Sequence, residues 1–381
     1  MRILMSIPSL ERGGAERQFA ALAAGLAARG HEVLAVTLDR AGPLAGELGR
    51  ARLVELMRGA GRNGLGALAA LAGLLRREAP QVHYAFLPTC TVRAAMLAPL
   101  VPATRLVLGI RAADSARGPN APRRLAGRLL LELEARLSPL ADLVVANSEA
   151  ARKACVGRGF APGRLHVVAN SVDTARFLPD RERGAALRRQ WGVVAGQTLV
   201  GVAARLDPHK GHAVFLEAAA LASAARPDLR FVCLGGGPQT LAAGLRERAL
   251  ALGVADRVAW TGEHADMPAA YNALDMLCLP SERESAPNVL AEGLACGLPC
   301  LASRVGDCEG MLGECGLTVA PGDAVALAGG MLALLARREA EGAGLAVRCR
   351  ARAEGLFSVE RMVEETEALF LKTRGAGGRQ G

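Results

Sequence analysis

The chain has 381 residues, of which 51% are hydrophobic and only 3% are aromatic. This length is sufficient for two domains, each with its own core. The scarcity of aromatic side chains argues against a module that stacks nucleic-acid bases. No uncharged apolar run reaches the length of about 18 residues that a membrane span needs, and Met1 to Leu4 leads directly into an apolar strand. We therefore expect no transmembrane span, no cleaved signal peptide and a cytoplasmic protein.

The net charge of +9 is concentrated in one half of the chain. Residues 1–175 contain 23 lysines and arginines against 13 acids, a net charge of +10, whereas residues 176–381 contain 23 against 24, a net charge of −1. A basic half favours an anionic partner. Because no nucleic-acid reading motif occurs, we expect an anionic membrane surface or a lipid-pyrophosphate-linked acceptor instead of nucleic acid.

One segment of the basic half has the pattern of an interfacial helix. Residues 121–140 carry Arg123, Arg124, Arg128 and Arg136 among leucines, as helices that lie on a membrane surface do. An ordinary surface helix packed on a sheet fits the same pattern, so both interpretations stay open.

The nine cysteines are an odd number scattered through apolar segments, which indicates reduced thiols. Four of them crowd together, but they form no CxxC pair and no histidine lies between them: Cys296, Cys300, Cys308 and Cys315. The sequence therefore predicts no metal site and no cofactor.

Short apolar runs alternate with helical patterns along the chain. In the first half they lie at 3–7, 33–38, 82–85, 106–110, 143–146 and 165–168; in the second half at 199–203, 231–234, 258–260, 276–279 and 300–302. Such alternation builds parallel, doubly wound sheets. We predict an α/β protein with two Rossmann-like domains that face each other across a cleft, joined by a linker near 177–183.

The domain boundaries follow from these runs. We expect a first domain over 1–175, a second over 176–355, and a last helix over 356–372 with Ser358 as its cap. Residues 373–381 are rich in glycine and arginine, which is typical of a disordered tail.

The first loop, Gly13-Gly14-Ala15-Glu16, follows the first strand and opens a helix. Glycines let the backbone approach a phosphate, and the amino end of a helix favours an anion. The spacing GxGxxG is absent, which argues against a dehydrogenase.

Two cations, Arg205 and Lys210, lie on the loop that follows the strand 199–203. The guanidinium can bind a diphosphate through two hydrogen bonds and the ammonium as a point charge. Only three of the 46 basic residues are lysine, which favours a requirement for lysine in this loop. A solvated surface loop is the alternative.

Residues 281–302 are predicted to run as loop, helix and strand after the strand 276–279. Ser285 is the expected N-cap, with Pro287 in the first turn and Gly297 at the end. Glu284 and Glu292 then flank the amino end of this helix. The backbone amides of Asn288 and Val289 favour an anion there. Two carboxylates beside an anion site suit a nucleotide-sugar, although two ordinary surface acids fit as well.

This stretch resembles the signature of retaining GT-B glycosyltransferases of family 4, two glutamates separated by seven residues. Here Glu284 and Glu292 hold these positions, followed by Ala-Cys-Gly-Leu-Pro over 295–299. The loop at Gly13 and the Arg205-x-x-x-x-Lys210 motif resemble family motifs in the same order. One departure is that Ser285 follows the first glutamate, where glycine is usual.

The resemblance implies roles for named residues. Arg205 and Lys210 would neutralise the leaving diphosphate, Glu284 would hold the sugar, and Glu292 would bind the ribose. The remaining donor-binding positions that it implies are Gly13, Gly14, Gly235, Gly262, Glu263, Ser285, Asn288 and Val289.

The acceptor side departs from the family pattern. Members often place a histidine after a middle strand of the first domain, whereas this chain has Arg111, with Asp114 nearby. We expect Arg111 to act electrostatically at the sugar or acceptor and Asp114 to position a hydroxyl. His83, between valine and tyrosine in a strand, is interpreted as a satisfied residue of the sheet.

The resemblance implies a retaining, metal-independent hexosyltransferase. It would move a sugar from a UDP- or GDP-sugar to a glycan or a lipid-pyrophosphate-linked acceptor, in surface polysaccharide or lipopolysaccharide synthesis on the inner face of the membrane. Residues 1–175 would hold the acceptor and 176–355 the donor, and the last helix would cross back to the first domain. A nucleotide-sugar 2-epimerase and a non-catalytic scaffold of the same fold remain alternatives.

Overall fold

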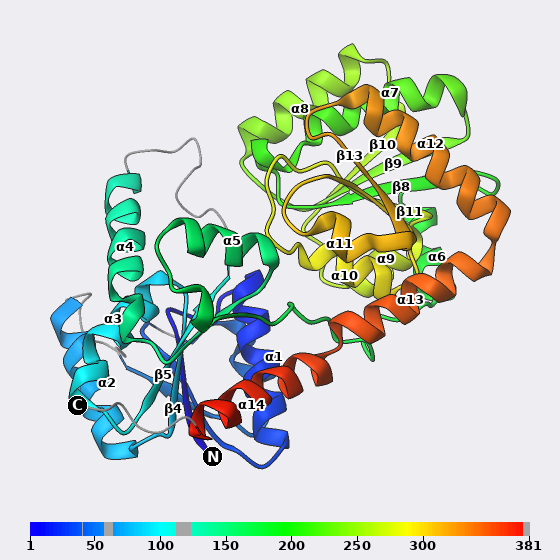
Figure 1. Ribbon diagram of the computed structural model, residues 1–381. Helices are drawn as coiled ribbons and strands as arrows, with labels where there is room; N and C mark the ends of the chain where they lie inside the picture. The colour runs from blue at the N-terminus through cyan, green and yellow to red at the C-terminus, as the bar shows by residue number, and fades with distance from the viewer. Residues whose placement is uncertain (40, 57–63, 112–122, 376–381) are drawn as a thin grey trace. The chain divides into compact units, whose positions relative to one another are not determined.

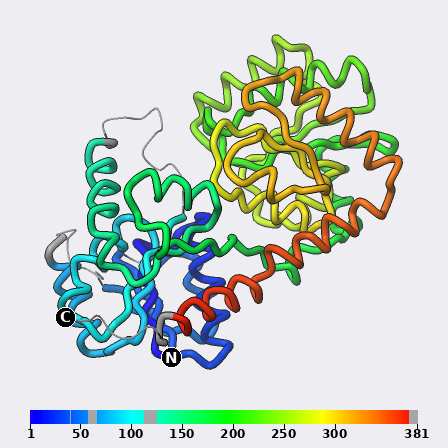
Figure 2. Tube along the Cα trace, in the orientation of Figure 1, coloured from blue at the N-terminus to red at the C-terminus, as the bar shows by residue number. Residues whose placement is uncertain are grey.

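The structure is a computed structural model that describes residues 1–39, 41–56, 64–111 and 123–375. The chain divides into two compact units. Unit 1 contains Met1–Ser171 and the segment from Val359 onward, and unit 2 contains Val172–Ser358. The chain thus leaves unit 1 after Ser171 and rejoins it through its last helix (Figure 2). None of the described helices is both long and apolar enough to cross a membrane.

Unit 1 is built on a parallel sheet with the strand order β3-β2-β1-β4-β5-β6-β7. Figure 1 labels β4 and β5 of this sheet. Its strands are β1 (Arg2–Ile7), β2 (Glu32–Thr37), β3 (Arg52–Glu55), β4 (Val82–Phe86), β5 (Arg105–Ile110), β6 (Leu143–Ala146) and β7 (Leu165–Val167). Its helices are α1 (Gly14–Ala28), α2 (Gly64–Glu78), α3 (Pro88–Leu97), α4 (Arg123–Leu137), α5 (Glu149–Gly157) and α14 (Val359–Gly375). The central strands are buried on both faces, which explains their continuous apolar runs.

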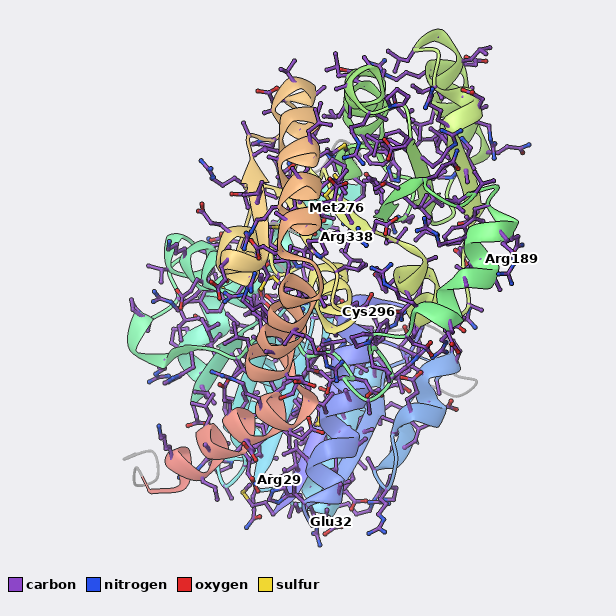
Figure 3. The ribbon with its side chains drawn as sticks, turned by 90° about the vertical axis from the view of Figure 1, so that its right-hand side faces the viewer. Arg29, Glu32, Arg189, Met276, Cys296 and Arg338 are labelled. Atoms are coloured by element: carbon purple, nitrogen blue, oxygen red, sulfur yellow. The ribbon has the colours of Figure 1, made fainter. Side chains whose placement is uncertain are left out.

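One face of this sheet is covered by α1 and α14. Ile3 and Met5 pack in a core with Phe19 of α1 and Val363 of α14. A Cβ added at Gly25 would collide with Val363, so glycine allows the two helices to approach closely. Arg29, labelled in Figure 3, donates from Nε to Glu367 of α14 at 2.8 Å.

Unit 2 has a second parallel sheet, with the order β10-β9-β8-β11-β12-β13. Its strands are β8 (Thr198–Ala203), β9 (Leu229–Leu234), β10 (Val258–Gly262), β11 (Met276–Leu279), β12 (Cys300–Ser303) and β13 (Gly316–Val319). Its helices are α6 (Arg181–Gln190), α7 (His212–Ala225), α8 (Gln239–Ala251), α9 (Met267–Ala273), α10 (Asn288–Ala295), α11 (Cys308–Leu312), α12 (Ala324–Glu341) and α13 (Ala343–Phe357). Together the two units give the α/β, two-sheet architecture expected from the sequence.

Several boundaries differ from those expected. The linker predicted near 177–183 runs into α6, because Asp180 accepts a hydrogen bond from the Arg183 amide and caps that helix. Helix α14 extends to Gly375, so the first residues of the predicted tail are helical, and the remainder lies outside the described residues. The first segment of unit 1 ends at Ser171, just before the predicted boundary at residue 175.

A glycine on α6 tests how tightly unit 2 is packed. A Cβ at Gly184 would collide with the backbone of Asn272 in α9, whereas one at Gly244 in α8 would meet nothing within 4 Å. We expect Gly184→Ala to lower the free energy of unfolding by about 2 kcal/mol through overpacking. Gly244→Ala should raise it by about 0.5–1 kcal/mol through its helix propensity. Chemical denaturation measures both, and equal effects of the two changes would contradict this packing.

Candidate active site

The carboxyl edge of the sheet in unit 2 gathers most of the predicted site residues. The strand order reverses between β8 and β11, and open α/β sheets bind ligands at such a switch point. The loop after β8 carries Arg205 and Lys210, and the loop after β11 carries Glu284. The fold therefore brings these two loops together although they are far apart in the sequence.

Lys210 and Glu284 form an ion pair across this switch point. The Lys210 Nζ donates to Glu284 Oε1 at 2.6 Å. The Glu284 side chain is 11% exposed and the Lys210 side chain 30% exposed, so the carboxylate is the more deeply buried partner. A pair this short and this sheltered is charge-assisted and geometrically fixed. It places one cation and one anion side by side at the carboxyl edge of the sheet.

The backbone around Lys210 fixes its position. Pro208–Lys210 forms a short 3-10 helix, and Asp207 caps it by accepting from the His209 amide at 3.0 Å. Gly211 follows with φ of +71°, and a Cβ there would collide with the Pro280 carbonyl oxygen. Only glycine satisfies both conditions, so the two loops can pack directly against each other.

Further contacts tie the two loops together. The Glu282 amide donates to the His209 carbonyl at 2.8 Å, and the His209 ring lies 3.1 Å from the Glu282 carboxylate. These bonds join the backbone on both sides of the Lys210–Glu284 pair. The pair is thus supported by the loops themselves and not only by its own charges.

Arg205 lies apart from this pair. Its side chain is 73% exposed and donates to Asp207 Oδ2 at 3.1 Å. Burial would raise the pKa of Asp207, but bonds from the His209 amide and Arg205 hold that pKa below its ordinary value. Arg205 therefore pairs with the carboxylate that caps the Lys210 turn, and most of its side chain is exposed.

The loop before α10 differs from the prediction. Pro287, in an extended conformation, is the N-cap and makes no side-chain cap bond, and the helix begins at Asn288. Ser285 is therefore not the N-cap, because a proline disfavours helical conformation in the residue before it and the helix starts only beyond it. The Asp307 amide instead donates to the Ser285 carbonyl at 2.9 Å. Val289, in the first turn, remains at the amino end of the helix.

Glu292 is more enclosed than the sequence indicates. It is 7% exposed, and the fully buried Tyr271 of α9 donates to its carboxylate at 2.6 Å. Burial, reinforced by the Glu292 charge, raises the pKa of Tyr271 well above its ordinary value. Tyr271 therefore stays a donor and orients the second glutamate of the signature.

The glycine turns lie on the same edge. Gly235 and Gly262 form a bridge, in which the Gly235 amide donates to the Gly262 carbonyl at 2.8 Å. Gly235 has φ of +142°, and a Cβ there would collide with the Ala204 carbonyl. A Cβ at Gly236 would lie 3.0 Å from Glu263 Cγ. The turns after β9 and β10 therefore adjoin the Arg205 loop.

Sequence reasoning missed several polar groups beside the pair. His212 is 2% exposed, and neither ring nitrogen has a hydrogen-bond partner among the described residues. Burial, with the charge of Lys210, lowers the pKa of His212 to about 4, so this ring is neutral. The buried Ser281 hydroxyl likewise has no partner in the described part of the chain. Their closeness to Lys210 and Glu284 in sequence was the available signal.

A third loop, which follows β12, packs against the loop that carries Glu284. A Cβ at Gly306, which has φ of +54°, would collide with the carbonyl oxygens of Glu284 and Ser285. Gly306 therefore allows this loop to pack against the backbone that carries the first glutamate. It was not singled out from the sequence, because a glycine in the loop after the next strand gives no local sign of such a contact.

The cysteines in this unit are packed inside it. All nine in the chain are buried and free, and burial raises the pKa of the Cys296 thiol to about 12. Within the described ranges, no group of three or more potential metal ligands is placed to hold an ion.

Unit 1 carries its own predicted residues at the carboxyl edge of its sheet. There the order reverses between β1 and β4. Gly13 is the N-cap of α1 in an extended conformation, and the helix begins at Gly14. Arg111 directly follows β5, whereas Asp114 lies outside the described residues. His83 is buried and lies 3.0 Å from the Ser6 hydroxyl, in agreement with its interpretation as a satisfied residue of the sheet.

Two parallel α/β units, each with polar residues at its carboxyl edge, define the class of two-domain enzymes with the GT-B fold. Comparison with known families gives the same class. Residues 12–176 match the model described as Glycosyltransferase Family 4, and residues 197–337 match Glycosyl transferases group 1. The chain belongs to this family of glycosyltransferases.

Relatives and solved structures agree with this assignment. A D-inositol 3-phosphate glycosyltransferase of Salinispora arenicola is 34% identical over 226 residues, which are 55% of this chain and 49% of that protein. The chain thus spans about half the length of the curated relatives it matches. The structure of Anabaena Alr3699/HepE in complex with UDP has a TM-score of 0.83 at 22% identity, covering 98% of this chain and 100% of that one. Its complex with UDP-glucose gives 0.79 at 23%, over 99% and 100%.

Gly211 provides a test of how the site is built. Gly211→Ala should lower the free energy of unfolding by about 1 kcal/mol through its left-handed backbone, and by more through the collision with Pro280. Gly322→Ala is the matched control, since Gly322 has φ of +76° and open space around it. Denaturation curves of both variants separate strain from collision. Equal losses would show that Gly211 does not seat the loop against Pro280.

Proposed function

We propose that this protein is a retaining glycosyltransferase that moves a hexose from a UDP- or GDP-sugar to a glycan or lipid-linked acceptor. The observation that carries the proposal is the Lys210–Glu284 pair at the switch point of unit 2. A nucleotide-sugar offers the two groups that this pair recognises, an anionic diphosphate and a sugar with hydroxyl donors. Retention of the anomeric configuration and independence from a metal rest on the family resemblance.

The pair is arranged to exchange partners when a donor binds. The diphosphate would accept hydrogen bonds from the Lys210 ammonium, which now binds Glu284. The Glu284 carboxylate would then accept from the hydroxyls of the sugar. As the bond from the sugar to the diphosphate breaks, negative charge grows on the diphosphate, and Lys210, Arg205 and the amino end of α10 would stabilise it.

The remaining loops supply the rest of the donor site in this proposal. Glu292, oriented by Tyr271, would bind the ribose. The turns at Gly235 and Gly262, with Glu263, would frame the base. The Anabaena protein binds UDP and UDP-glucose, which supports a uridine nucleotide as the first donor to test.

Loss of Lys210 provides the direct test. Lys210→Ala should reduce the turnover number by about 100-fold or more, since a preorganised charge opposite a leaving group contributes this much. It should also remove most of the thermal stabilisation by UDP or GDP. Lys153→Ala, at an exposed position of α5, is the control and should change neither. Turnover close to the unmodified enzyme in purified Lys210→Ala would contradict the assigned role.

The same assays separate the alternative functions. A 2-epimerase would convert the UDP-sugar with no acceptor present. A scaffold would bind no nucleotide at all, whatever residue stood at position 210.

We further propose that α4 contacts an anionic membrane surface, where a lipid-linked acceptor would be found. Leu125, Leu129 and Leu133 are 69%, 61% and 40% exposed, and their spacing places them on one stripe of the helix. Arg128 is exposed beside this stripe. Apolar side chains flanked by cations match a surface of anionic lipid headgroups.

The opposite face of α4 is fixed to the rest of unit 1. Glu134 is 2% exposed, accepts from the Thr91 hydroxyl at 2.6 Å and accepts from Arg158 at 2.6 Å. These bonds hold the helix by its inner face, so the leucine stripe cannot turn inward without breaking them. The leucines therefore stay available to a partner.

Vesicle binding tests the leucine stripe. We expect the protein to sediment with phosphatidylglycerol vesicles and not with phosphatidylcholine vesicles. Replacing Leu125, Leu129 and Leu133 together by serine should weaken binding at least about tenfold, because buried leucine surface contributes over 1 kcal/mol per side chain. Leu250→Ser, at a leucine of α8 that is 72% exposed, serves as the control. Equal binding by the triple variant would rule out this surface.

A further inference from the structure

Arg111 occupies an unusual environment at the carboxyl edge of unit 1. It is the first residue after β5, and its neighbour strand β4 contributes Tyr84 and Phe86. Gly109 makes room for these rings, since a Cβ there would lie 3.0 Å from Tyr84 Cε2 and 3.3 Å from Phe86 Cδ2. The glycine lets both aromatic side chains lie against the end of β5. Arg111 is therefore placed over an aromatic floor.

Among the described residues, the guanidinium contacts neutral groups only. Its Cζ lies 4.3 Å from the centroid of the Phe86 ring. Nη2 donates to the Tyr84 hydroxyl at 3.0 Å, and Nη1 lies 3.5 Å from Asn170 Oδ1. Nε is buried, and no described residue accepts a hydrogen bond from it. These contacts fix the orientation of the cation without cancelling its charge.

No carboxylate in the described part of the chain forms an ion pair with Arg111. This distinguishes it from arginines such as Arg158 and Arg188, which bind the buried acids Glu134 and Asp275. A half-buried arginine without a counter-charge is costly to maintain. An anion supplied by a ligand would offset this unfavourable free energy.

The support behind Arg111 is rigid. Tyr84 is fully buried, and its ring lies 4.6 Å from that of Phe86 and 5.6 Å, edge to face, from that of Phe370 in α14. Burial raises the pKa of Tyr84, although the charge of Arg111 opposes that rise. The phenol therefore stays protonated and neutral, so Tyr84 does not supply a negative charge to Arg111.

The backbone next to this floor is strained. Leu87, which follows Phe86, has φ of +70° and ψ of 150°, a combination that residues other than glycine rarely adopt. Its carbonyl accepts from the Cys90 and Thr91 amides at 2.9 and 3.0 Å, which holds the conformation in place. Such strain is found at ligand-binding edges more often than elsewhere.

We propose that Arg111 binds a phosphate group carried by the acceptor. A guanidinium fixed in orientation is suited to a phosphate, which it binds through two parallel hydrogen bonds. The net charge of +10 over residues 1–175 would draw such an anion toward this unit. The proposal rests on the proposed transferase function, since it assigns the acceptor to the carboxyl edge of unit 1. It makes Arg111 an acceptor-binding residue.

The phosphate has two chemical sources, a pyrophosphate that links a glycan to a lipid and a phosphate monoester on a soluble sugar or polyol. Both present the same anionic oxygens to Arg111. Inorganic pyrophosphate and inorganic phosphate are the corresponding probes. Whichever of the two binds more tightly indicates the source.

Calorimetric titration with these two anions, at saturating UDP, tests the proposal. UDP fills the donor site in unit 2, so that the anions cannot bind at Lys210. We expect at least one anion to bind the unmodified protein, and Arg111→Gln to weaken that binding at least tenfold. Arg111→Lys should retain part of it. Arg152→Gln, at a partly exposed arginine of α5 that pairs with Glu149 at 2.7 Å, should have no effect.

A failure of the Arg111 proposal can be distinguished from a failure of the proposed donor site. The melting temperature of each variant checks its folding, and UDP affinity should be the same in all three. Equal anion affinity in the unmodified protein and Arg111→Gln would overturn the proposal, as would failure of both anions to bind at millimolar concentration while UDP binds. Failure of UDP and GDP alone to bind would instead contradict the proposed function, and the difference in anion affinity between the unmodified protein and Arg111→Gln would still report on Arg111.

Discussion

The ion pair between Lys210 and Glu284 is the interaction on which the account of unit 2 depends. It joins the ends of β8 and β11 where the sheet reverses its order, so the topology creates the site and the charges define what it can bind. The surrounding glycines serve this contact. Gly211 lets the two loops touch, and Gly306 allows a third loop to close behind Glu284. A ligand that separates the pair must offer an anion to one partner and hydrogen-bond donors to the other.

Unit 1 holds the charged side chain at its carboxyl edge in a different way. Its carboxyl edge holds a cation, Arg111, against the aromatic rings of Tyr84 and Phe86 instead of against an acid. In unit 2 the charges satisfy each other until a ligand arrives, whereas in unit 1 the charge is left for the ligand to satisfy. This difference fits a donor that brings both an anion and hydroxyls, and an acceptor recognised through an anion.

The sequence was most informative where burial is complete. Strands such as β1 and β4 are buried on both faces, so their apolar runs were visible and the two-sheet architecture could be predicted. Strands β3 and β13 were missed; both lie at an edge of their sheet and are only partly buried. The edge strands β7 and β10 were predicted nevertheless, so an edge position alone does not hide a strand. The predicted cap at Ser285 was wrong because Pro287, a local feature, decides where α10 begins.

The motifs named candidate site residues but not how these residues are held. Glu284 and Lys210 could be named from their spacing and from the rarity of lysine. The bond from Tyr271 to Glu292, and the aromatic floor beneath Arg111, join residues from different elements. Contacts of this kind depend on tertiary packing and leave no local pattern in a single sequence.

Hydrogen–deuterium exchange with and without UDP or GDP is the most direct measurement of the central claim. The nucleotide that raises the melting temperature most should slow exchange in four loops at the carboxyl edge of unit 2, at 204–211, 235–237, 262–264 and 281–289. Exchange at the opposite edge of that sheet should be unchanged, and Lys210→Ala should weaken the protection. Protection confined to other parts of the chain, under conditions where the nucleotide binds, would contradict the donor site described here.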